Sequence, residues 1–322
     1  MEISVVDQSP IFTNTNADQA IRDSVELAQY SDQIGLKRFW LAEHHGSSSF
    51  AGCSPEILIS RIASSTKNIR VGSGGIMLMH YSPYKVAENF RLLESMFPRR
   101  IDLGLGRAPG SDPFQAGALA YGSKTTGPEF FPTKMNDLRS FLSNQTPETK
   151  SFENVNVTPG LGDVPDTWLL VSSEQGADYA SFFGLPMSLA YFINQDCLHL
   201  AKPYRENFQK SIFGDSPQVS VAVFAICAET NEEANLLASS ASIWRENVSK
   251  GIFGPFPTLE EATKKIKEKE EGKSIVGDQK YVEGQLMKIL EETNADELKI
   301  ITICESMSSK KESYRLIKEI FS

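Results

Sequence analysis

The sequence has few cysteines and few histidines, four of each in 322 residues. The cysteines are widely scattered and form no CxxC pair, so they predict neither a zinc site nor a disulfide framework, and we expect a reducing cytoplasm. No apolar run approaches the ~18 residues of a membrane-spanning helix. The opening segment MEISVVDQSP also has none of the features of a secretory signal. We therefore expect no membrane partner.

Basic residues are outnumbered and do not cluster. The chain has 32 Lys and Arg against 41 Asp and Glu, which gives a formal net charge of −9. A protein whose main partner is nucleic acid or an anionic membrane normally presents a positive surface. The charge balance therefore argues against both partners.

Short apolar runs alternate with helical segments along the whole chain. The runs that resemble buried strands cover residues 3–6, 38–42, 69–75, 101–106, 167–171, 186–190, 219–228 and 298–304. Two of the intervening helices are expected to begin at Ser54-Pro55 and Ser82-Pro83, since proline is favoured at the first helical position. Such alternation over ~300 residues predicts an α/β fold, a (β/α)8 TIM barrel with insertions. We expect residues 1–322 to form one domain.

The glycine-rich turn of an open, doubly wound sheet is missing. Such a sheet normally has this turn directly after its first strand, where this chain has Asp7-Gln8-Ser9-Pro10. The barrel is therefore favoured over this alternative. Because the active sites of barrels lie at the C-terminal ends of the strands, the residues that follow each strand are the candidate site residues.

Two of the four histidines are adjacent, in the segment LAEHHG at residues 41–46. Neighbouring side chains on a strand point to opposite faces. Glu43, His44 and His45 are therefore poorly placed to share one metal ion, and we expect no metal site. A neutral imidazole can accept or donate a proton near neutral pH. The pair is a candidate for proton transfer, although a lone buried histidine is more often structural.

Three further strand ends carry candidate site residues, and two of them suit a phosphorylated ligand. Gly74-Gly75 permits backbone geometry that a Cβ would forbid, although an ordinary turn would also explain it. Arg107 can grip a phosphate with two parallel hydrogen bonds. Ser172 and Ser173 precede a predicted helix, whose first N–H groups form an anion site. A surface arginine and an N-cap serine are the alternative interpretation.

Four motifs together resemble the bacterial luciferase-like flavin-dependent monooxygenase family, and within it the alkanal-monooxygenase-like subgroup that begins with a DQSP strand. The motifs are WLAEHH, RVGSGGIML, FPRRIDLGLGRAPG and LLVSSEQGADYASFFGLP, in the family's order and spacing. The resemblance implies a catalytic site of His44 with its neighbours Glu43 and His45. It also implies a non-prolyl cis peptide between Gly74 and Gly75 beneath the flavin ring. It further implies that the flavin phosphate is bound by Arg107, Ser172, Ser173 and Gly176.

The function implied by this resemblance is that of a monooxygenase. Reduced FMN would come from a separate flavin reductase, and O2 would add to the flavin C4a carbon to give a peroxide or hydroperoxide. This would oxidise an aldehyde-like or other small organic substrate. The cofactor carries the redox step, while the protein excludes water and manages protons. A homodimer is expected by the same resemblance.

Two positions depart from the family pattern, and other functions stay open. Val171 stands where the subgroup often has glycine, and Gly106 stands where light-emitting members have cysteine, which puts bioluminescence in doubt. One alternative is F420-dependent hydride transfer, although the acidic tail of F420 would require basic residues beyond Arg107. Another is a flavin-binding protein without turnover. A metal-dependent barrel hydrolase is a more distant alternative.

One segment, residues 258–273, is densely charged with alternating signs and has few apolar residues. A solvated helix is one interpretation of this pattern. The other is a mobile lid inserted near the pocket, which we place at residues 250–275.

Overall fold

The computed structural model describes residues 1–107, 112–147, 149–160, 162–265 and 274–322. Parallel strands close into a barrel, because β10 pairs with β1 on one side and with β8 on the other. Around the barrel the strands are β1 (Glu2–Asp7), β2 (Arg38–Leu41), β3 (Arg70–Ser73), β5 (Ile101–Gly106), β6 (Asp166–Val171), β7 (Met187–Ala190), β8 (Val219–Cys227) and β10 (Glu297–Ile301). Each overlaps a predicted strand, and the predicted (β/α)8 barrel is confirmed.

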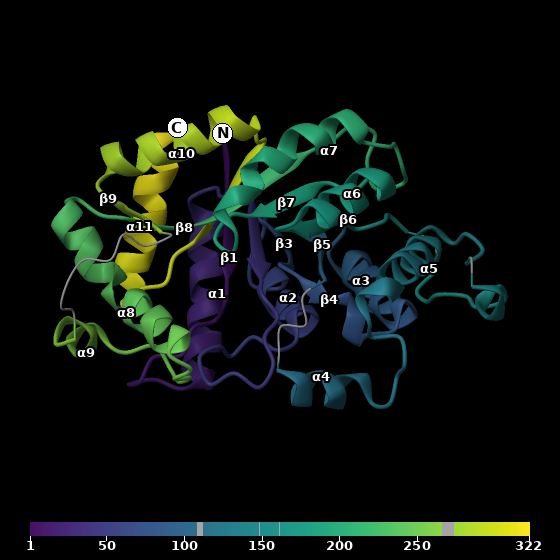
Figure 1. The fold of residues 1–322 in the computed structure, drawn as a ribbon, viewed down its shortest axis with the longest axis horizontal. Helices are drawn as coiled ribbons and strands as arrows, with labels where there is room; N and C mark the ends of the chain where they lie inside the picture. Colours follow the sequence, from purple (N-terminus) through teal and green to yellow (C-terminus); the bar gives the residue numbers. More distant parts are fainter. Residues whose placement is uncertain (108–111, 148, 161, 266–273) are drawn as a thin grey trace.

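Helices surround the barrel, with α3 and α5 on one side and α8 and α11 on the opposite side (Figure 1). The longer helices are α1 (Ala17–Gln33), α2 (Pro55–Ala63), α3 (Pro83–Met96), α5 (Phe131–Ser143), α6 (Glu174–Phe183), α8 (Asn231–Ser249), α10 (Gln279–Thr293) and α11 (Met307–Ile320). The shorter elements are α4 (Pro113–Ala120), α7 (Ala201–Asn207), α9 (Leu259–Thr263), β4 (Ile76–Met77) and β9 (Ile275–Gly277). Among the described residues, no helix has both the length and the apolar composition needed to cross a membrane.

The starts of α2 and α3 are determined by proline. Both helices begin at the proline of the predicted Ser-Pro pair, Pro55 and Pro83. Neither Ser54 nor Ser82 makes a side-chain capping hydrogen bond. The fixed φ of proline, which is already helical, is therefore the effective start signal.

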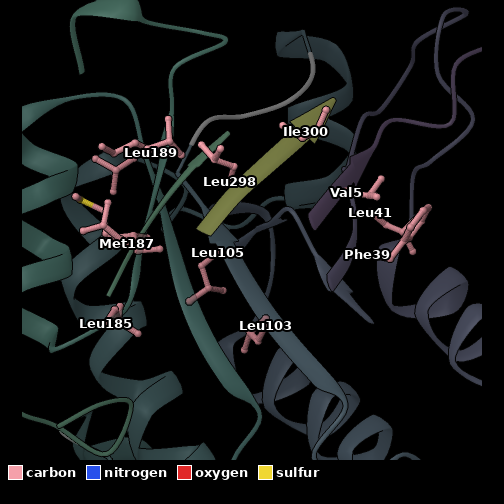
Figure 2. Close-up of a cluster of buried hydrophobic side chains, with 14 of the residues drawn as sticks. Val5, Phe39, Leu41, Leu103, Leu105, Leu185, Met187, Leu189, Leu298 and Ile300 are labelled. Atoms are coloured by element: carbon pink, nitrogen blue, oxygen red, sulfur yellow. The ribbon is translucent and has the colours of Figure 1, made fainter. Parts of the chain in front are cut away.

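The main apolar core lies between the barrel and its helices (Figure 2). Side chains from several strands contribute, and Val5, Leu103 and Leu298 are each fully buried. Successive side chains of a strand face opposite sides. Leu103 and Leu105 therefore pack towards the helices, while Asp102, which directly precedes Leu103, faces the barrel interior.

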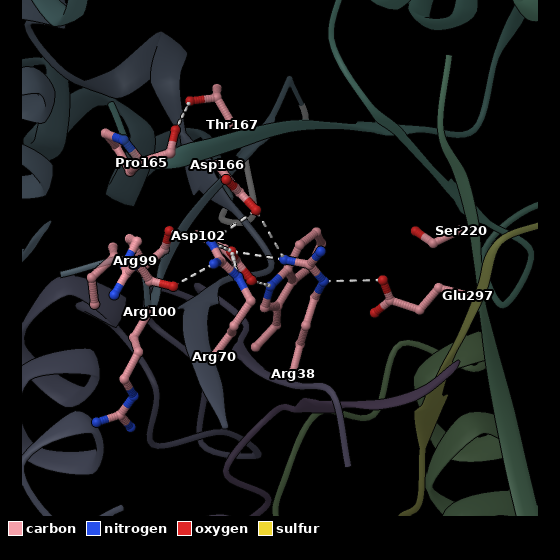
Figure 3. A network of polar contacts seen from close by, with 12 residues as sticks. Arg38, Arg70, Arg99, Arg100, Asp102, Pro165, Asp166, Thr167, Ser220 and Glu297 are labelled. Atoms are coloured by element: carbon pink, nitrogen blue, oxygen red, sulfur yellow. Dashed lines mark hydrogen bonds and ion pairs between the residues drawn. The ribbon is translucent and has the colours of Figure 1, made fainter. Parts of the chain in front are cut away.

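The barrel interior is charged at the N-terminal ends of the strands (Figure 3). Arg38 donates hydrogen bonds to Asp102 at 2.8 Å and to Glu297 at 3.0 Å. The indole Nε1 of Trp40 donates to the other Asp102 oxygen at 2.9 Å. Burial alone would raise the pKa of Asp102, but Arg38 and Arg70 lower it overall. This end of the barrel is filled by paired charges, so a ligand site is expected at the opposite end.

The expected lid at residues 250–275 is described only in part, because residues 266–273 lie outside the described residues. In the described part, Phe256 is fully buried. Its N–H donates to the Ile11 carbonyl at 2.8 Å, and its carbonyl accepts from the Thr13 N–H at 2.9 Å. This stretch is therefore anchored beyond the end of β1, and it is not poor in apolar contacts. The mobile lid stays a prediction.

Candidate functional site

A buried carboxylate, Glu43, organises the end of β2. The side chain is 1% exposed, and its Oε1 accepts hydrogen bonds from His45 Nε2 and from the Tyr81 hydroxyl, both at 2.6 Å. Its Oε2 accepts the backbone N–H of Met77 in β4 at 3.0 Å. One carboxylate thus fixes His45 and ties the end of β2 to β4.

Tyr81 acts as a donor in this network. Burial, and then the hydrogen bond to Glu43, raise the pKa of Tyr81 above its usual value. The phenol therefore stays protonated, and its O–H donates a hydrogen bond to the Glu43 carboxylate. Its oxygen lies 3.3 Å from His45 Nε2. Glu43 and Tyr81 together determine the position of the His45 ring.

His44 lies outside the Glu43 network. Its ring stacks on Phe50, with centroids 4.3 Å apart and an interplanar angle of 24°. Its Nδ1 is buried and has no hydrogen-bond partner in the part of the chain that the structure describes. Burial, and then the charge of His45, lower the pKa of His44 to about 4. His44 is therefore a neutral imidazole at neutral pH.

Glu43 and His44 are adjacent in sequence, but their side chains make no hydrogen bond to each other among the contacts of the described residues. Glu43 bonds His45 instead, because adjacent side chains diverge at the end of the strand. Among the described residues, no group of three or more His, Cys, Asp or Glu could hold a metal ion.

The peptide bond between Gly74 and Gly75 is cis, as the resemblance implied. A Cβ on Gly75 would lie 2.7 Å from the carbonyl oxygen of Gly104 in β5. A Cβ on Gly74 would lie 3.1 Å from the Cβ of Trp40. The end of β3 therefore lies against neighbouring strands with a closeness that only glycine permits.

Arg107 and Ser173 meet at the ends of β5 and β6. Arg107 Nη2 donates to Ser173 Oγ at 2.9 Å, and Nη1 donates to Gln175 Oε1 at 2.7 Å. The guanidinium carbon lies 5.4 Å from the centroid of the Tyr179 ring. Ser173 is the N-cap of α6, so the cation lies at the positive end of this helix. We call Arg107, Ser173 and the first turn of α6 the arginine clamp.

Ser172 and Gly176 lie beside the arginine clamp. The carbonyl of Ser172 accepts a hydrogen bond from Asn194 Nδ2 at 3.0 Å. The N–H of Gly176 donates to the Ser173 carbonyl at 3.0 Å, so this donor is used within the helix start. A Cβ on Gly176 would lie 3.2 Å from Val171 Cγ1. Gly176 thus makes room for the larger Val171, and a role of Ser172 and Gly176 in cofactor binding stays a prediction.

The Glu43 network and the arginine clamp are parts of one strand edge. Met77, whose N–H bonds Glu43, pairs with Gly106 in the β4–β5 ladder. Gly106 directly precedes Arg107. The predicted catalytic and phosphate-binding residues are therefore brought together at the C-terminal face of the barrel.

An aromatic cluster lies next to His44. Phe50, on which His44 stacks, contacts Trp244 and Phe256 with ring centroids 5.5 Å and 5.6 Å away. Trp244 and Phe256 stack on each other at 4.6 Å. These rings supply the apolar surroundings that lower the pKa of His44.

Sequence reasoning missed several residues of this site. Gln175 and Tyr179 both contact Arg107 and are four residues apart on α6. Their spacing could have indicated that they share one helix face. Tyr81 had no such signal, since it lies 38 residues from Glu43 in the sequence.

Polar side chains that converge at the C-terminal strand ends of a closed parallel barrel are typical of (β/α)8 barrel enzymes. Comparison with known proteins narrows this class. The model of the luciferase-like monooxygenase family matches residues 1–291. The chain belongs to the luciferase-like monooxygenase family, which supports a role as an oxygenase.

Individual relatives cover most or all of the chain. YwcH of Bacillus subtilis (strain 168) is 39% identical over 331 aligned residues, which cover 100% of this chain and 99% of YwcH. The N-acetyl-S-alkylcysteine monooxygenase of the same organism is 37% identical to this chain. The alignment covers 73% of this chain and 70% of the monooxygenase. Among solved structures, the crystal structure of apo-MsnO8 superimposes on this chain with a TM-score of 0.90 and 33% sequence identity. The superposition covers 99% of this chain and 98% of MsnO8.

Proposed function

We propose that the chain is an FMN-dependent monooxygenase that uses reduced FMN and O2 to oxidise an aldehyde-like or other small organic substrate. The arginine clamp is the observation that carries this proposal. The Arg107 guanidinium donates hydrogen bonds to two neutral side chains, Ser173 and Gln175, at the N-terminus of α6. Such a group binds a phosphate with charge-assisted hydrogen bonds.

The residues present fit this cofactor. Arg107, Ser173 and the start of α6 would hold the FMN phosphate, and the close-packed Gly74-Gly75 segment would support the ring. When bound, reduced FMN supplies the electrons for activation of O2. The aromatic cluster around Phe50 would keep water from this part of the site.

His44 is the residue that we assign to proton transfer. Its pKa of about 4 keeps it neutral, and its Nδ1 has no hydrogen-bond partner among the described residues, so this nitrogen can accept or donate a proton. Glu43 and His45 are assigned the role of positioning His44. Their hydrogen bond fixes the backbone that carries His44 and joins it to the strand ends around the cofactor site.

An anaerobic titration tests this function. The protein is titrated with FMNH2, riboflavin and F420, then exposed to O2 with a panel of aldehydes and other small substrates. We expect FMNH2 to bind more tightly than riboflavin, and O2 to be consumed with formation of an oxygenated product. Turnover with F420 and no oxygen consumption would instead support hydride transfer. Binding of FMNH2 without product would support the non-catalytic alternative.

Two partners are also proposed. A separate flavin reductase would supply FMNH2, and the chain would form a homodimer. We expect turnover with NADH and oxidised FMN only when a reductase is added. Light scattering of the purified chain measures the oligomeric state, and a monomeric mass would contradict the dimer.

A further inference from the structure

A second cation near the C-terminal end of the barrel has no charged partner among the residues that the structure describes. Arg245 lies on α8, and its guanidinium carbon is 5.4 Å from the centroid of the Phe224 ring. Within the described part of the chain no hydrogen bond or ion pair to this guanidinium is found. Arg245 is partly buried, and this burial lowers the pKa of its guanidinium. A partly desolvated charge is stabilised when a counter-charge is supplied.

Arg245 lines a small cavity that contains another unpaired polar group. The cavity lies between α8, β9 and the ends of β8 and β10, and its volume is about 10 Å³. Ser274 also lines it, and the buried Ser274 Oγ has no hydrogen-bond partner among the described residues. The other walls are apolar and include Phe224, Val276, Ile301 and Ile303. A cation and a buried hydroxyl therefore line one small, mostly apolar cavity.

We propose that Arg245 and Ser274 bind the carboxylate of an organic substrate as hydrogen-bond donors, with one carboxylate oxygen inside this cavity. The guanidinium supplies the opposite charge and a planar pair of N–H donors, which match the two oxygens of a carboxylate. The hydroxyl of Ser274 supplies one more donor. That the bound acid is a substrate rests on the proposed monooxygenase function.

The size of the cavity decides which part of the ligand it receives. A volume of about 10 Å³ is near the smallest space that admits one water molecule, so it takes a carboxylate oxygen and excludes an alkyl chain. A phosphate, with its tetrahedral group of oxygens, is bulkier than the planar carboxylate and fits this space less well. The rest of a carboxylated substrate must lie outside the cavity.

Residues next to this cavity and next to His44 pack against one apolar cluster. Phe224 contacts Phe192, with ring centroids 5.3 Å apart. Phe224 also packs against the apolar cluster that includes Phe50 and Trp244. His44 stacks on Phe50. A ligand held by its carboxylate at Arg245 would therefore lie beside the same apolar cluster that borders His44, the residue assigned to proton transfer.

The test measures binding of two probes that share the same chain length and differ in their head group, a carboxylate in one and a neutral hydroxyl in the other. Octanoate and 1-octanol are titrated into the purified protein by calorimetry, with and without FMN. We expect wild type to bind octanoate at least about tenfold more tightly than octanol, as a charge-assisted contact implies. Arg245→Met should abolish this preference, Arg245→Lys should retain part of it, and Ser274→Ala should weaken it. The matched control is Arg22→Met, which removes an exposed arginine on α1 and should change nothing.

Several results would overturn the proposal. They are equal affinity for the two probes in wild type, a preference that survives Arg245→Met, and binding of chloride or acetate as tight as that of octanoate. Circular dichroism shows whether each variant is folded, and if Arg245→Met is not, Arg245→Lys and Ser274→Ala carry the comparison. Because no turnover is measured, failure here leaves the monooxygenase proposal untouched. Absence of oxygen consumption leaves the carboxylate site untouched.

Discussion

The lowered pKa of His44 predicts a specific loss of stability in acid. Its pKa falls from the ordinary 6.5 to about 4. As the pH falls below 6.5 the unfolded chain takes up the proton first, so protonation favours unfolding. The stabilisation is complete above pH 6.5, is lost progressively towards pH 4 and then levels off. The shift corresponds to roughly 3 kcal/mol in all, of which about 2 kcal/mol is lost by pH 5.

The assay compares wild type with His44→Gln, which keeps a polar side chain but does not titrate in this range. Denaturant unfolding at pH 7.5 and pH 5.0 gives the free energy of unfolding of each protein. We expect wild type to lose about 2 kcal/mol more than His44→Gln between these values, because only wild type carries the shifted imidazole. His199→Gln, which removes an exposed histidine, should behave as wild type.

Nuclear magnetic resonance gives an independent measurement. The chain has four histidines, so each Cε1–H signal can be followed through a pH titration and assigned by single substitution. The signal lost in His44→Gln should titrate near pH 4. A midpoint near 6.5, or identical pH dependence of stability in wild type and His44→Gln, would refute the assignment of a buried neutral His44.

Three further predictions follow from the site. Arg107→Ala should weaken FMN binding by roughly 1.5–3 kcal/mol but leave riboflavin binding nearly unchanged, because riboflavin has no phosphate; equal losses in calorimetry would reject the clamp. His44→Ala should slow turnover by ~10²–10⁴-fold with FMNH2 affinity largely retained, whereas His45→Ala should cost more stability and less rate; wild-type turnover by His44→Ala in stopped-flow experiments would make His44 structural. Gly75→Ala should lower Tm, because its Cβ would lie 2.7 Å from a β5 carbonyl oxygen, while Gly106→Ala, whose Cβ would be 3.8 Å from its nearest neighbour, should not; similar Tm values for both variants would contradict this packing argument.

Much of the fold could be predicted from the sequence, because it depends on local signals. Alternating apolar runs and helical segments predicted the strands and the barrel. The prolines at positions 55 and 83 predicted two helix starts that the structure confirms. Neither serine before these prolines makes a side-chain capping hydrogen bond, because capping depends on a rotamer that the sequence does not determine.

The charged interior of the barrel could not be predicted. Arg38 and Asp102 are 64 residues apart, and their hydrogen bond forms only when the strands close into the barrel at one register. In sequence each is a charged residue beside an apolar run. Such a pair is stable inside the barrel because each charge is matched by its partner, which is a property of the assembled strands.

Part of the candidate site could likewise be predicted from the sequence, and part could not. The sequence by itself determined which residues stand at strand ends, since their positions follow from the strand pattern: the Glu-His-His segment, the glycine pair, Arg107 and the serines before α6. Only the tertiary structure decided that Glu43 holds His45 and Tyr81 while His44 is left neutral against Phe50, and that Arg245 and Ser274 face one cavity. The physical reason is that hydrogen-bond partners and pKa values depend on burial and on neighbours distant in sequence, which exist only once the strands and helices have packed.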